Sequence, residues 1–336
     1  MTISESFLAA FAVLAAAVVS AGMIWALRPF LLRHALAKPN ARSSHRVPTP
    51  QGAGIAVIAA TLTVSGSLII FTGSEALNIP IAVFGASLFI SIVGFADDVK
   101  SIEALPRLML QAAAVAVIIF ASSSDLRILP ACPHWIESCI LLLAGVWFVN
   151  LVNFMDGLDW MSVAEVVPIT GTMVILGSLG KFPPTATIVA AALCGAMLGF
   201  APFNRPVAKI FLGDVGSLPI GLLLGWCLLQ LAYHQQFTAA LLLPLYYLFD
   251  ATITLSRRLI RRERFWAAHR SHFYQRATDN GFTVWRVVSE VFALNLGLAV
   301  LAVASTMTQS VTTNVLFLVL GSIAVSLVLL RFSRQR

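Results

Sequence analysis

The feature that most constrains this chain is a series of apolar blocks, each long enough to cross a bilayer as a helix. About 11 blocks qualify, at roughly 7–27, 53–71, 79–96, 105–121, 137–153, 161–179, 185–201, 215–233, 237–256, 286–306 and 312–330. Backbone groups in lipid must bond internally, so the blocks predict helices and not open sheets. Only 11% of the residues are charged, against about 25% in soluble domains. The sequence therefore predicts an all-α polytopic membrane protein, with one domain over 1–336.

The N-terminal block predicts no cleaved signal peptide, and the cysteines predict no disulfide or metal site. Glu5 is the only charged side chain before the apolar run 7–27, so we expect a retained helix there and not a cleaved signal peptide. The cysteines form no CxxC pair, and we expect them to be small apolar residues within helices; they are Cys132, Cys139, Cys194 and Cys227.

Lysine and arginine predict the orientation of the helices. If the chain starts outside, its inner segments are 28–52, 97–107, 154–160, 202–214, 257–285 and 331–336. These segments, with Arg286 at the mouth of a neighbouring helix, hold every Lys and Arg except Arg127 and Lys181. The positive-inside rule then predicts a periplasmic N-terminus and a cytoplasmic C-terminus, in a bacterial inner membrane. The same rule accounts for the net charge of +7 without a nucleic-acid partner.

Carboxylates gather on the same inner side, although Asp and Glu contribute little to topology. The acids that fall on the outer side are Glu5, Glu75, Asp125 and Glu137. A cation-dependent site on the cytoplasmic face is the simplest explanation of this bias.

Two adjacent carboxylates, Asp97 and Asp98, end the third block, and Lys100 follows them. Adjacent carboxylates repel each other, so a nearby cation such as Mg²⁺ or a lysine favours keeping both ionised. A solvated acidic loop that caps the following helix explains the pair equally well.

A polar run closes the fifth block. Its members are Asn150, Asn153, Asp156, Gly157 and Asp159. Three-residue spacing puts the two asparagines on one helical face, where amides can bind a nucleobase or a sugar amide. The alternative is that Asn153 and Gly157 end one helix while Asp159 caps the next. Four polar residues beside apolar helices favour a functional site.

Two glycines bracket Asp214 at the start of the eighth block, in the string Phe211-Leu212-Gly213-Asp214-Val215-Gly216-Ser217. Free amides at a helix N-terminus bind phosphate oxygens, and a carboxylate there can hold Mg²⁺. A simple helix cap at Asp214 also explains the motif.

The segment 257–285 is rich in basic residues. Arginines at its start suit a membrane interface, where they can also serve as topology anchors. Two histidines and two arginines then fall within eight residues, a dense surface for phosphate: His269, Arg270, His272 and Arg276.

Together these motifs predict a cation site, an anion site and apolar walls on one membrane face, which suits phosphoryl transfer to a lipid. The main alternative is a secondary transporter, but transporters place ionisable groups near the bilayer midplane. Here Asp250 is the deepest candidate, and it lies toward the inner end. A non-catalytic partner with a degenerate site is a third hypothesis, which the intact motif set disfavours.

The ordered motifs resemble the polyprenyl-phosphate N-acetylhexosamine-1-phosphate transferases (glycosyltransferase family 4), a family that includes phospho-N-acetylmuramoyl-pentapeptide transferase. The resemblance runs from about Arg42 to Arg276, and the string from His269 to Arg276 looks like the bacterial branch that starts O-antigen-like surface polysaccharides. It implies transfer of a HexNAc-1-phosphate from a UDP-HexNAc to undecaprenyl phosphate in the bilayer, with release of UMP. It names Mg²⁺ as the cofactor, with Mn²⁺ as an alternative, and a homodimer is one possible assembly.

The resemblance also implies roles for single residues. Asp214 would hold the metal, and Asp97 or Asp98 would deprotonate or position the lipid phosphate. The donor nucleoside would lie against Phe211, Asn153, Asp156 and Asp159. Phosphates or the sugar would be bound by His269, His272 and nearby basic residues, namely Lys100, Arg270 and Arg276. Both a one-step and a covalent two-step mechanism fit the family, and we favour direct attack on the β-phosphorus.

The sequence departs from the family pattern at three places. Trp160 stands where a second glycine often follows Asp159, Gln51 and Ala53 replace a frequent Arg and Gly, and the histidine block reads His-Arg-Ser-His. These changes bear on the identity of the sugar and not on the class of reaction. We expect a substrate other than the muramoyl-pentapeptide.

Overall fold

The structure is a computed structural model that describes residues 3–37, 48–72, 80–122, 126–263 and 269–335. Within these ranges, ten helices are long and apolar enough to cross a membrane, which confirms an all-α polytopic membrane protein. They are α1 (Ile3–His34), α2 (Gly54–Thr72), α3 (Ile81–Val99), α4 (Ala104–Ala121), α5 (His134–Met155), α6 (Met161–Ser178), α7 (Pro184–Asn204), α8 (Asp214–Tyr233), α12 (Val284–Thr306) and α13 (Val311–Phe332).

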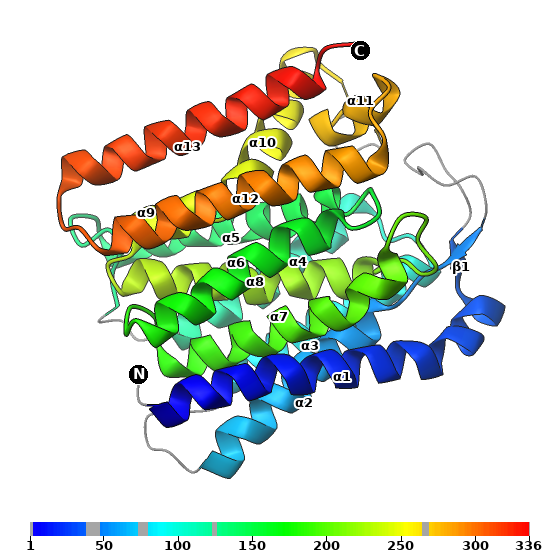
Figure 1. The fold of residues 1–336 in the computed structure, drawn as a ribbon, viewed down its shortest axis with the longest axis horizontal. Helices are drawn as coiled ribbons and strands as arrows, with labels where there is room; N and C mark the ends of the chain where they lie inside the picture. The colour runs from blue at the N-terminus through cyan, green and yellow to red at the C-terminus, as the bar shows by residue number, and fades with distance from the viewer. Residues whose placement is uncertain (1–2, 38–47, 73–79, 123–125, 264–268, 336) are drawn as a thin grey trace.

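The long helices run side by side along one direction, with α1 and α13 on opposite flanks of the bundle (Figure 1). Helices α7 and α8 form its centre, since 83% of their spanning windows is buried, against 22% in α4 and α13. Helix α1 begins at one end of the bundle and α13 finishes at the other (Figure 1). Which end faces the cytoplasm stays a prediction from the basic residues.

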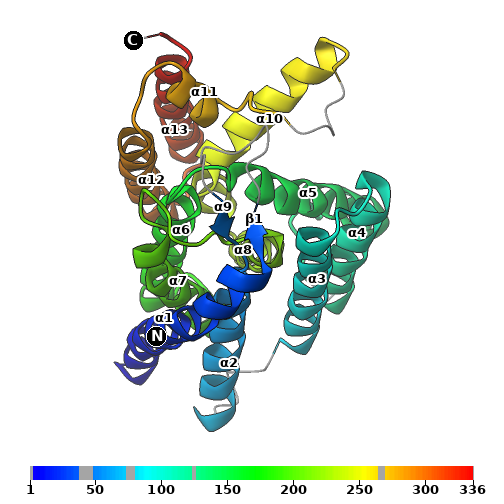
Figure 2. The same ribbon diagram turned by 90° about the vertical axis from the view of Figure 1, so that its right-hand side faces the viewer.

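The ninth predicted span, 237–256, is broken. A short helix α9 (Phe237–Leu242) stops before Pro244, and α10 (Leu245–Ile260) starts directly after it. Proline has no backbone N–H to donate and its ring crowds the preceding turn, so it favours a break or a kink at this place. Helix α10 leaves the bundle at a strong tilt and projects beyond its neighbours (Figure 2).

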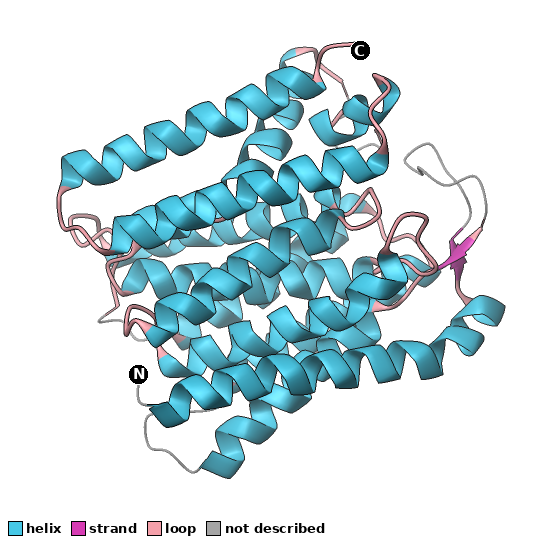
Figure 3. Ribbon diagram, in the orientation of Figure 1, coloured by secondary structure: helices cyan, strands magenta, loops and turns pink. Residues whose placement is uncertain are grey.

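Short elements that the hydropathy pattern does not predict lie at one end of the bundle. Strands β1 (Leu36–Ala37) and β2 (Thr49–Pro50) pair antiparallel, and α11 (Phe273–Asp279) follows the basic segment. The hairpin and the loops around it lie at the right-hand end in Figure 3, the end at which α3 and α5 finish and α8 begins. This end therefore holds the polar motifs. Residues 42–47 and 264–268 of the basic segments lie outside the described ranges.

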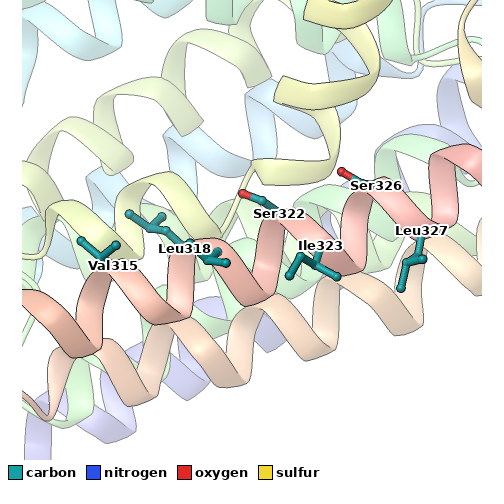
Figure 4. A pocket seen from close by; sticks show the side chains of 7 residues that line it. Val315, Leu318, Ser322, Ile323, Ser326 and Leu327 are labelled. Atoms are coloured by element: carbon teal, nitrogen blue, oxygen red, sulfur yellow. The ribbon is translucent and has the colours of Figure 1, made fainter.

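The flank of the bundle formed by α13 is apolar. A groove of about 390 Å³ runs along it, with Ser322 and Ser326 pointing to the same side among aliphatic side chains (Figure 4). Exposed aliphatic residues continue over its outer face, including Leu316, Leu320 and Leu327. Such a surface suits contact with lipid chains and carries no charged group for chemistry.

Candidate active site

Asp98 ties the end of α3 to the start of α8. Its Oδ1 accepts the backbone N–H of Asp214 at 3.0 Å, and its Oδ2 accepts that of Val215 at 3.0 Å. Asp98 is thus the cap of α8, contributed by another helix. The sequence predicts that free backbone amides at the start of α8 bind phosphate. These two amides are hydrogen-bonded to the Asp98 carboxylate instead.

Two glycines permit this close approach. Gly94 packs against the backbone of Asp214 with no room for a Cβ atom. Gly213, the residue before α8, has φ +79° and faces the Asp98 carboxylate. Only glycine adopts that conformation readily. The glycines that flank the aspartates in sequence therefore serve to join α3 to α8.

Arg107 lies between the two acidic motifs. Asp97 accepts the Ile102 N–H at 2.6 Å and the Arg107 Nη1 donor at 2.7 Å. The same Nη1 lies 3.9 Å from Asp214 Oδ2. Arg107 belongs to the first turn of α4, and none of the motifs taken from the sequence includes it. An arginine at the mouth of a span, ten residues after paired acids, was the signal that could have found it.

Asn153 completes this group. Its Nδ2 donates to Asp214 Oδ1 and to Ser217 Oγ, both at 2.8 Å. Asn150, one turn earlier, points elsewhere, since its amide donates to Gln111 of α4. We call the set Asp97, Asp98, Arg107, Asn153 and Asp214 the acidic cluster.

Asp156 and Asp159 lie in the turn between α5 and α6. Burial raises the pKa of Asp156 to about 7, and the nearby charges of Asp98 and Asp159 act in the same direction. The Ser162 hydroxyl donates to Asp156. Asp159 accepts the Ala208 N–H at 2.9 Å and so holds the α7–α8 connection. The N-cap position of α6 is Trp160, the residue after Asp159.

Trp160 precedes α6 in the left-handed conformation, with φ 64°. Glycine adopts this conformation more readily than any other residue. The indole offsets the cost of this conformation, because its Nε1 donates to the Ala201 carbonyl at 2.6 Å and its ring meets Trp285 edge-on. The departure at Trp160 therefore preserves the turn.

A second group forms around His272, which is buried at the start of α11. Its Nδ1 lies 3.2 Å from Oδ1 of Asp250, and the ring of His269 is 4.9 Å away. Asp250 on α10 also accepts the N–H groups of Phe273 and Tyr274, at 2.9 and 3.1 Å. It thereby caps α11 and orients His272 together. We call His269, His272 and Asp250 the histidine cluster.

The predicted basic residues of this segment have partners of their own. Arg270 donates to Asp279 at 3.1 Å and to the Thr278 hydroxyl at 3.0 Å. Arg276 places its guanidinium 6.0 Å from the Phe273 ring. Both lie on or next to α11, so they border the histidine cluster.

Two further predicted residues flank the acidic cluster. Lys100 is exposed just beyond α3 and makes no side-chain hydrogen bond or ion pair with another described residue. Phe211 is half-buried before α8, and its backbone pairs with Pro50 and Gly52 next to the hairpin. The hairpin thus fixes the segment that leads into Asp214.

The end of α5 joins the two clusters. Asn153 contacts Asp214, whereas the next residue, Phe154, has its ring 6.4 Å from that of His272. The Phe154 carbonyl also accepts the Tyr274 hydroxyl at 3.0 Å. Adjacent residues of one helix thus contact the acidic cluster on one side and α11 on the other.

Asp214 is the carboxylate best suited to a metal ion. Among the described residues, no three His, Cys, Asp or Glu side chains form a metal-binding group. Mg²⁺ needs fewer, since it is usually held by one or two carboxylates, substrate phosphates and waters. Both oxygens of Asp97 and of Asp98 already accept donors. Asp214 Oδ2 lies 3.9 Å from Arg107 Nη1, beyond hydrogen-bond distance, and the Asp214 carboxyl is also a neighbour of the Asp97 carboxyl.

An apolar cavity of about 260 Å³ lies farther along the same helices, between α4, α5, α8 and α9. Val149 of α5 and Gly221 of α8 line it. Gly221 is about two helical turns from Asp214. The cavity continues from there to Ala232 and Phe237, next to the other end of α8, so only its end at Val149 and Gly221 lies near the acidic cluster.

Comparisons of the sequence with known proteins identify its family. Residues 80–232 match the family model described as glycosyl transferase family 4. The chain is 30% identical over 312 residues to the decaprenyl-phosphate N-acetylglucosaminephosphotransferase of Mycobacterium tuberculosis, covering 81% of this chain and 75% of that protein. The Mycobacterium leprae protein of the same name is 29% identical over 309 residues, covering 81% and 77%.

A second kind of relative is similar over a shorter stretch. The phospho-N-acetylmuramoyl-pentapeptide-transferase of Streptococcus pneumoniae is 29% identical over 218 residues, covering 61% of this chain and 65% of that protein. Both kinds carry the name of phosphotransferases, and none of these comparisons points to a transporter. The chain therefore belongs to glycosyl transferase family 4, among the polyprenyl-phosphate N-acetylhexosamine-1-phosphate transferases.

Proposed function

We propose that the protein transfers a HexNAc-1-phosphate from a UDP-HexNAc to undecaprenyl phosphate, releases UMP and thereby initiates a lipid-linked, O-antigen-like polysaccharide. The observation that carries the proposal is the meeting of Asp97, Asp98, Asn153 and Asp214 with Arg107 at one end of the bundle. Similarity to proteins named decaprenyl-phosphate N-acetylglucosaminephosphotransferase supports the class of reaction. We place this end of the bundle in the cytoplasm of a bacterium, on the basic residues around it.

The diphosphate of the donor is assigned to the acidic cluster. Asp214 would hold Mg²⁺ through Oδ2, with Asn153 fixing the carboxylate through Oδ1. When bound, the ion neutralises charge on the diphosphate. Arg107 stands next to the same oxygen and can donate to a phosphate that arrives there. The donor nucleoside would be bound by Phe211, Asp156 and Asp159. The positive charge of Lys100 would attract the anionic donor as it enters the site.

Asp98 is better suited to positioning than to proton transfer, because both of its oxygens accept amides of α8. The acceptor needs no strong base, since the second pKa of a phosphate monoester is about 6. An oxygen of the lipid phosphate bonds to the β-phosphorus of the donor. The bond from that phosphorus to the bridging oxygen breaks, and the oxygen departs with UMP. His269, His272, Arg270 and Arg276 are assigned to the phosphates and the sugar.

The acceptor lipid is assigned to the apolar side of the site. The cavity between α4, α5, α8 and α9 can take part of a polyprenyl chain, since its walls are apolar. The end of the cavity at Gly221 is the part nearest to Asp214, and a polyprenyl chain that leaves the cavity there would bring the lipid phosphate toward the donor. In this assignment the lipid chain lies next to α9 and the start of the tilted helix α10, the two parts of the broken span.

The test is UMP release by the purified protein, with undecaprenyl phosphate, Mg²⁺ and a panel of UDP-HexNAc donors. Mass spectrometry of the lipid product identifies the sugar that is transferred. We expect UMP and a lipid diphosphate-sugar in equal amounts, for one or a few donors. Absence of both with every donor, or movement of a sugar nucleotide across proteoliposomes without a lipid product, would rule the proposal out.

A further inference from the structure

Helix α4 carries Arg107 into the acidic cluster, yet it lies at the edge of the bundle, next to α3 and α5 (Figure 2). Its spanning window is 22% buried, against 33% in α5, 39% in α3 and 83% in α8. One face of α4 carries three residues at intervals of four, namely Arg107, Gln111 and Val115. The contacts of this face decide where the Arg107 guanidinium lies.

Gln111 joins α4 to α5 by a hydrogen bond in the interior of the bundle. Its side chain is fully buried, and its Oε1 accepts Nδ2 of Asn150 at 2.5 Å. Asn150 is buried as well, and the same Nδ2 donates to the Val146 carbonyl at 2.8 Å, which fixes the direction of the amide. The bond therefore links the two helices one turn away from Arg107.

The apolar contact beside this bond brings the helices together but does not align them. One turn farther along α4, Val115 packs against Gly145 of α5 with no room for a Cβ atom. Small residues let two helices in a membrane approach closely, but a surface of small and aliphatic side chains still permits sliding and rotation. A hydrogen bond between two side-chain amides has a narrow geometry. The bond between Gln111 and Asn150 therefore selects one alignment of α4 on α5.

Stability alone does not explain a glutamine at this place. Nε2 of Gln111 is buried and has no acceptor among the described residues. A buried donor without a partner costs free energy, and apolar side chains of similar size would avoid that cost. A polar residue inside a helix interface can instead fix the alignment of two helices, at a cost in stability.

The alignment has a direct consequence for the acidic cluster. One turn from the bond on α4, Arg107 Nη1 donates to Asp97 at 2.7 Å and lies 3.9 Å from Asp214 Oδ2. About one turn from the bond on α5, Asn153 donates to Asp214 Oδ1 at 2.8 Å. The two side chains that α4 and α5 direct toward Asp214 are therefore both set by the same interhelical bond.

We propose that Gln111, through its bond to Asn150, is a positioning residue that aligns α4 with α5 and so holds Arg107 at Asp214. The proposal rests on the proposed function for its effect on catalysis. Its structural part does not, because the order at the start of α4 can be measured without substrate.

The first experiment is a double-mutant cycle on kcat/KM for the UDP-HexNAc donor, with Gln111→Leu, Arg107→Ala and both together. A misplacement of about 1 Å can cost up to about 10²-fold, and we expect Gln111→Leu to lose about tenfold. Because the glutamine acts through Arg107, the same substitution in the Arg107→Ala background should lose less than about twofold. Losses that multiply in full would overturn the proposal.

The matched control is Asn295→Leu. Asn295 of α12 is also a buried amide that links two helices, since its Nδ2 donates to Glu165 Oε2 of α6 at 2.6 Å. Its loss of kcat/KM, whatever its size, should multiply in full with that of Arg107→Ala. If Asn295→Leu were as non-additive with Arg107→Ala as Gln111→Leu is, the effect would be a general loss of order, and the proposal would fail.

An exchange of the two side chains tests the bond itself. Gln111→Asn shortens one amide by a methylene and Asn150→Gln lengthens the other, so the double variant spans the same gap between α4 and α5. Each single variant should lose about fivefold to tenfold in kcat/KM, and the double variant should return to within about threefold of wild type. A double variant no better than the worse single variant would contradict the proposal.

The readout without substrate is hydrogen–deuterium exchange on the full-length protein in detergent. At the start of α4, Asp97 accepts both the Ile102 N–H and the Arg107 side chain. Gln111→Leu should therefore raise exchange at least about fivefold over residues 102–108, whereas Asn295→Leu should leave this segment unchanged. Wild-type exchange in Gln111→Leu, or an equal rise in all helices, would overturn the proposal.

If Gln111→Leu does not fold, Asn150→Leu takes its place, because it breaks the same bond from the side of α5. It should give the same non-additivity with Arg107→Ala and the same rise in exchange, and the absence of both would overturn the proposal. A wild type without transferase activity would refute the proposed function, and the exchange data would still decide the role of Gln111.

Discussion

The acidic cluster and the histidine cluster each contain an aspartate that caps the start of another helix, but the two aspartates lie in different surroundings. Asp98 caps α8 and Asp250 caps α11, each through two backbone amides. Asp98 is half-buried among other carboxylates at the ends of three long helices, whereas Asp250 is fully buried beside a histidine. The acidic cluster is therefore built by the bundle itself, while the histidine cluster depends on one tilted helix and one short one. The difference predicts which substitutions damage chemistry and which damage alignment.

The largest effect is expected at Asp214. Asp214→Asn removes the charge that would hold the metal against the diphosphate, so kcat for UMP release should fall roughly 10³-fold. Asp279→Asn is the control, because Asp279 is exposed and its ion pair among the described residues is with Arg270. The rate of this variant should remain within about twofold of wild type. Equal rates for Asp214→Asn and wild type would remove the acidic cluster from the mechanism.

The second largest effect on activity is expected at Arg107. Arg107→Ala deletes a guanidinium that touches Asp97 and faces Asp214, and kcat/KM for the donor should fall roughly 10²-fold. Lys100→Ala removes an equal charge from an exposed side chain nearby, and a fall of less than about tenfold is expected. A larger loss at Lys100 than at Arg107 would show that the ion-paired arginine serves only the fold.

Asp250 tests the histidine cluster. Asp250→Ala frees His272 and leaves the α11 amides without their acceptor, so kcat should fall about 10-fold to 10²-fold. His272→Ala in the same background should add little, because the histidine has already lost its orientation. If the double variant loses as much kcat as the product of the two single losses, Asp250 does not act through His272.

The smallest effect concerns pH. Because burial raises the pKa of Asp156 to about 7, the carboxylate is lost as pH falls below that value and is fully present above it. If the carboxylate binds the donor, KM for UDP-HexNAc should rise by up to about tenfold from pH 8 to pH 6. Asp156→Asn should show a high KM at both pH values. An unchanged slope in that variant would assign the pH dependence to another group.

Hydropathy was sufficient for the long helices, because an apolar run of about 20 residues has few options in a bilayer. It did not predict the break before Pro244, since a proline inside an apolar run can also produce a kink. The same limit hid α11 and the β1–β2 hairpin, which are too short to leave a periodic pattern.

The site was predictable where its chemistry is local in sequence. Asp97, Asp98, Asn153 and Asp214 sit in short polar motifs at helix ends, and the helices bring them together. Arg107 was missed because its partner Asp97 faces it across a turn, and Asp250 because it lies 22 residues before His272. The contact between Asp250 and His272 depends on the tilt of α10, and residue spacing in the sequence does not predict that tilt. Asp159 likewise accepts the backbone N–H of Ala208, 49 residues away.

The central claim is that the two clusters, on either side of the α5 end, work on one substrate. The most direct measurement is a double-mutant cycle on kcat/KM for the UDP-HexNAc donor, with Arg107→Ala, His272→Ala and both together. Groups that act on the same diphosphate are strongly non-additive, so the double variant should lose about tenfold less than the product of the single losses. Losses that multiply in full would mean that the clusters act independently, and would contradict the claim.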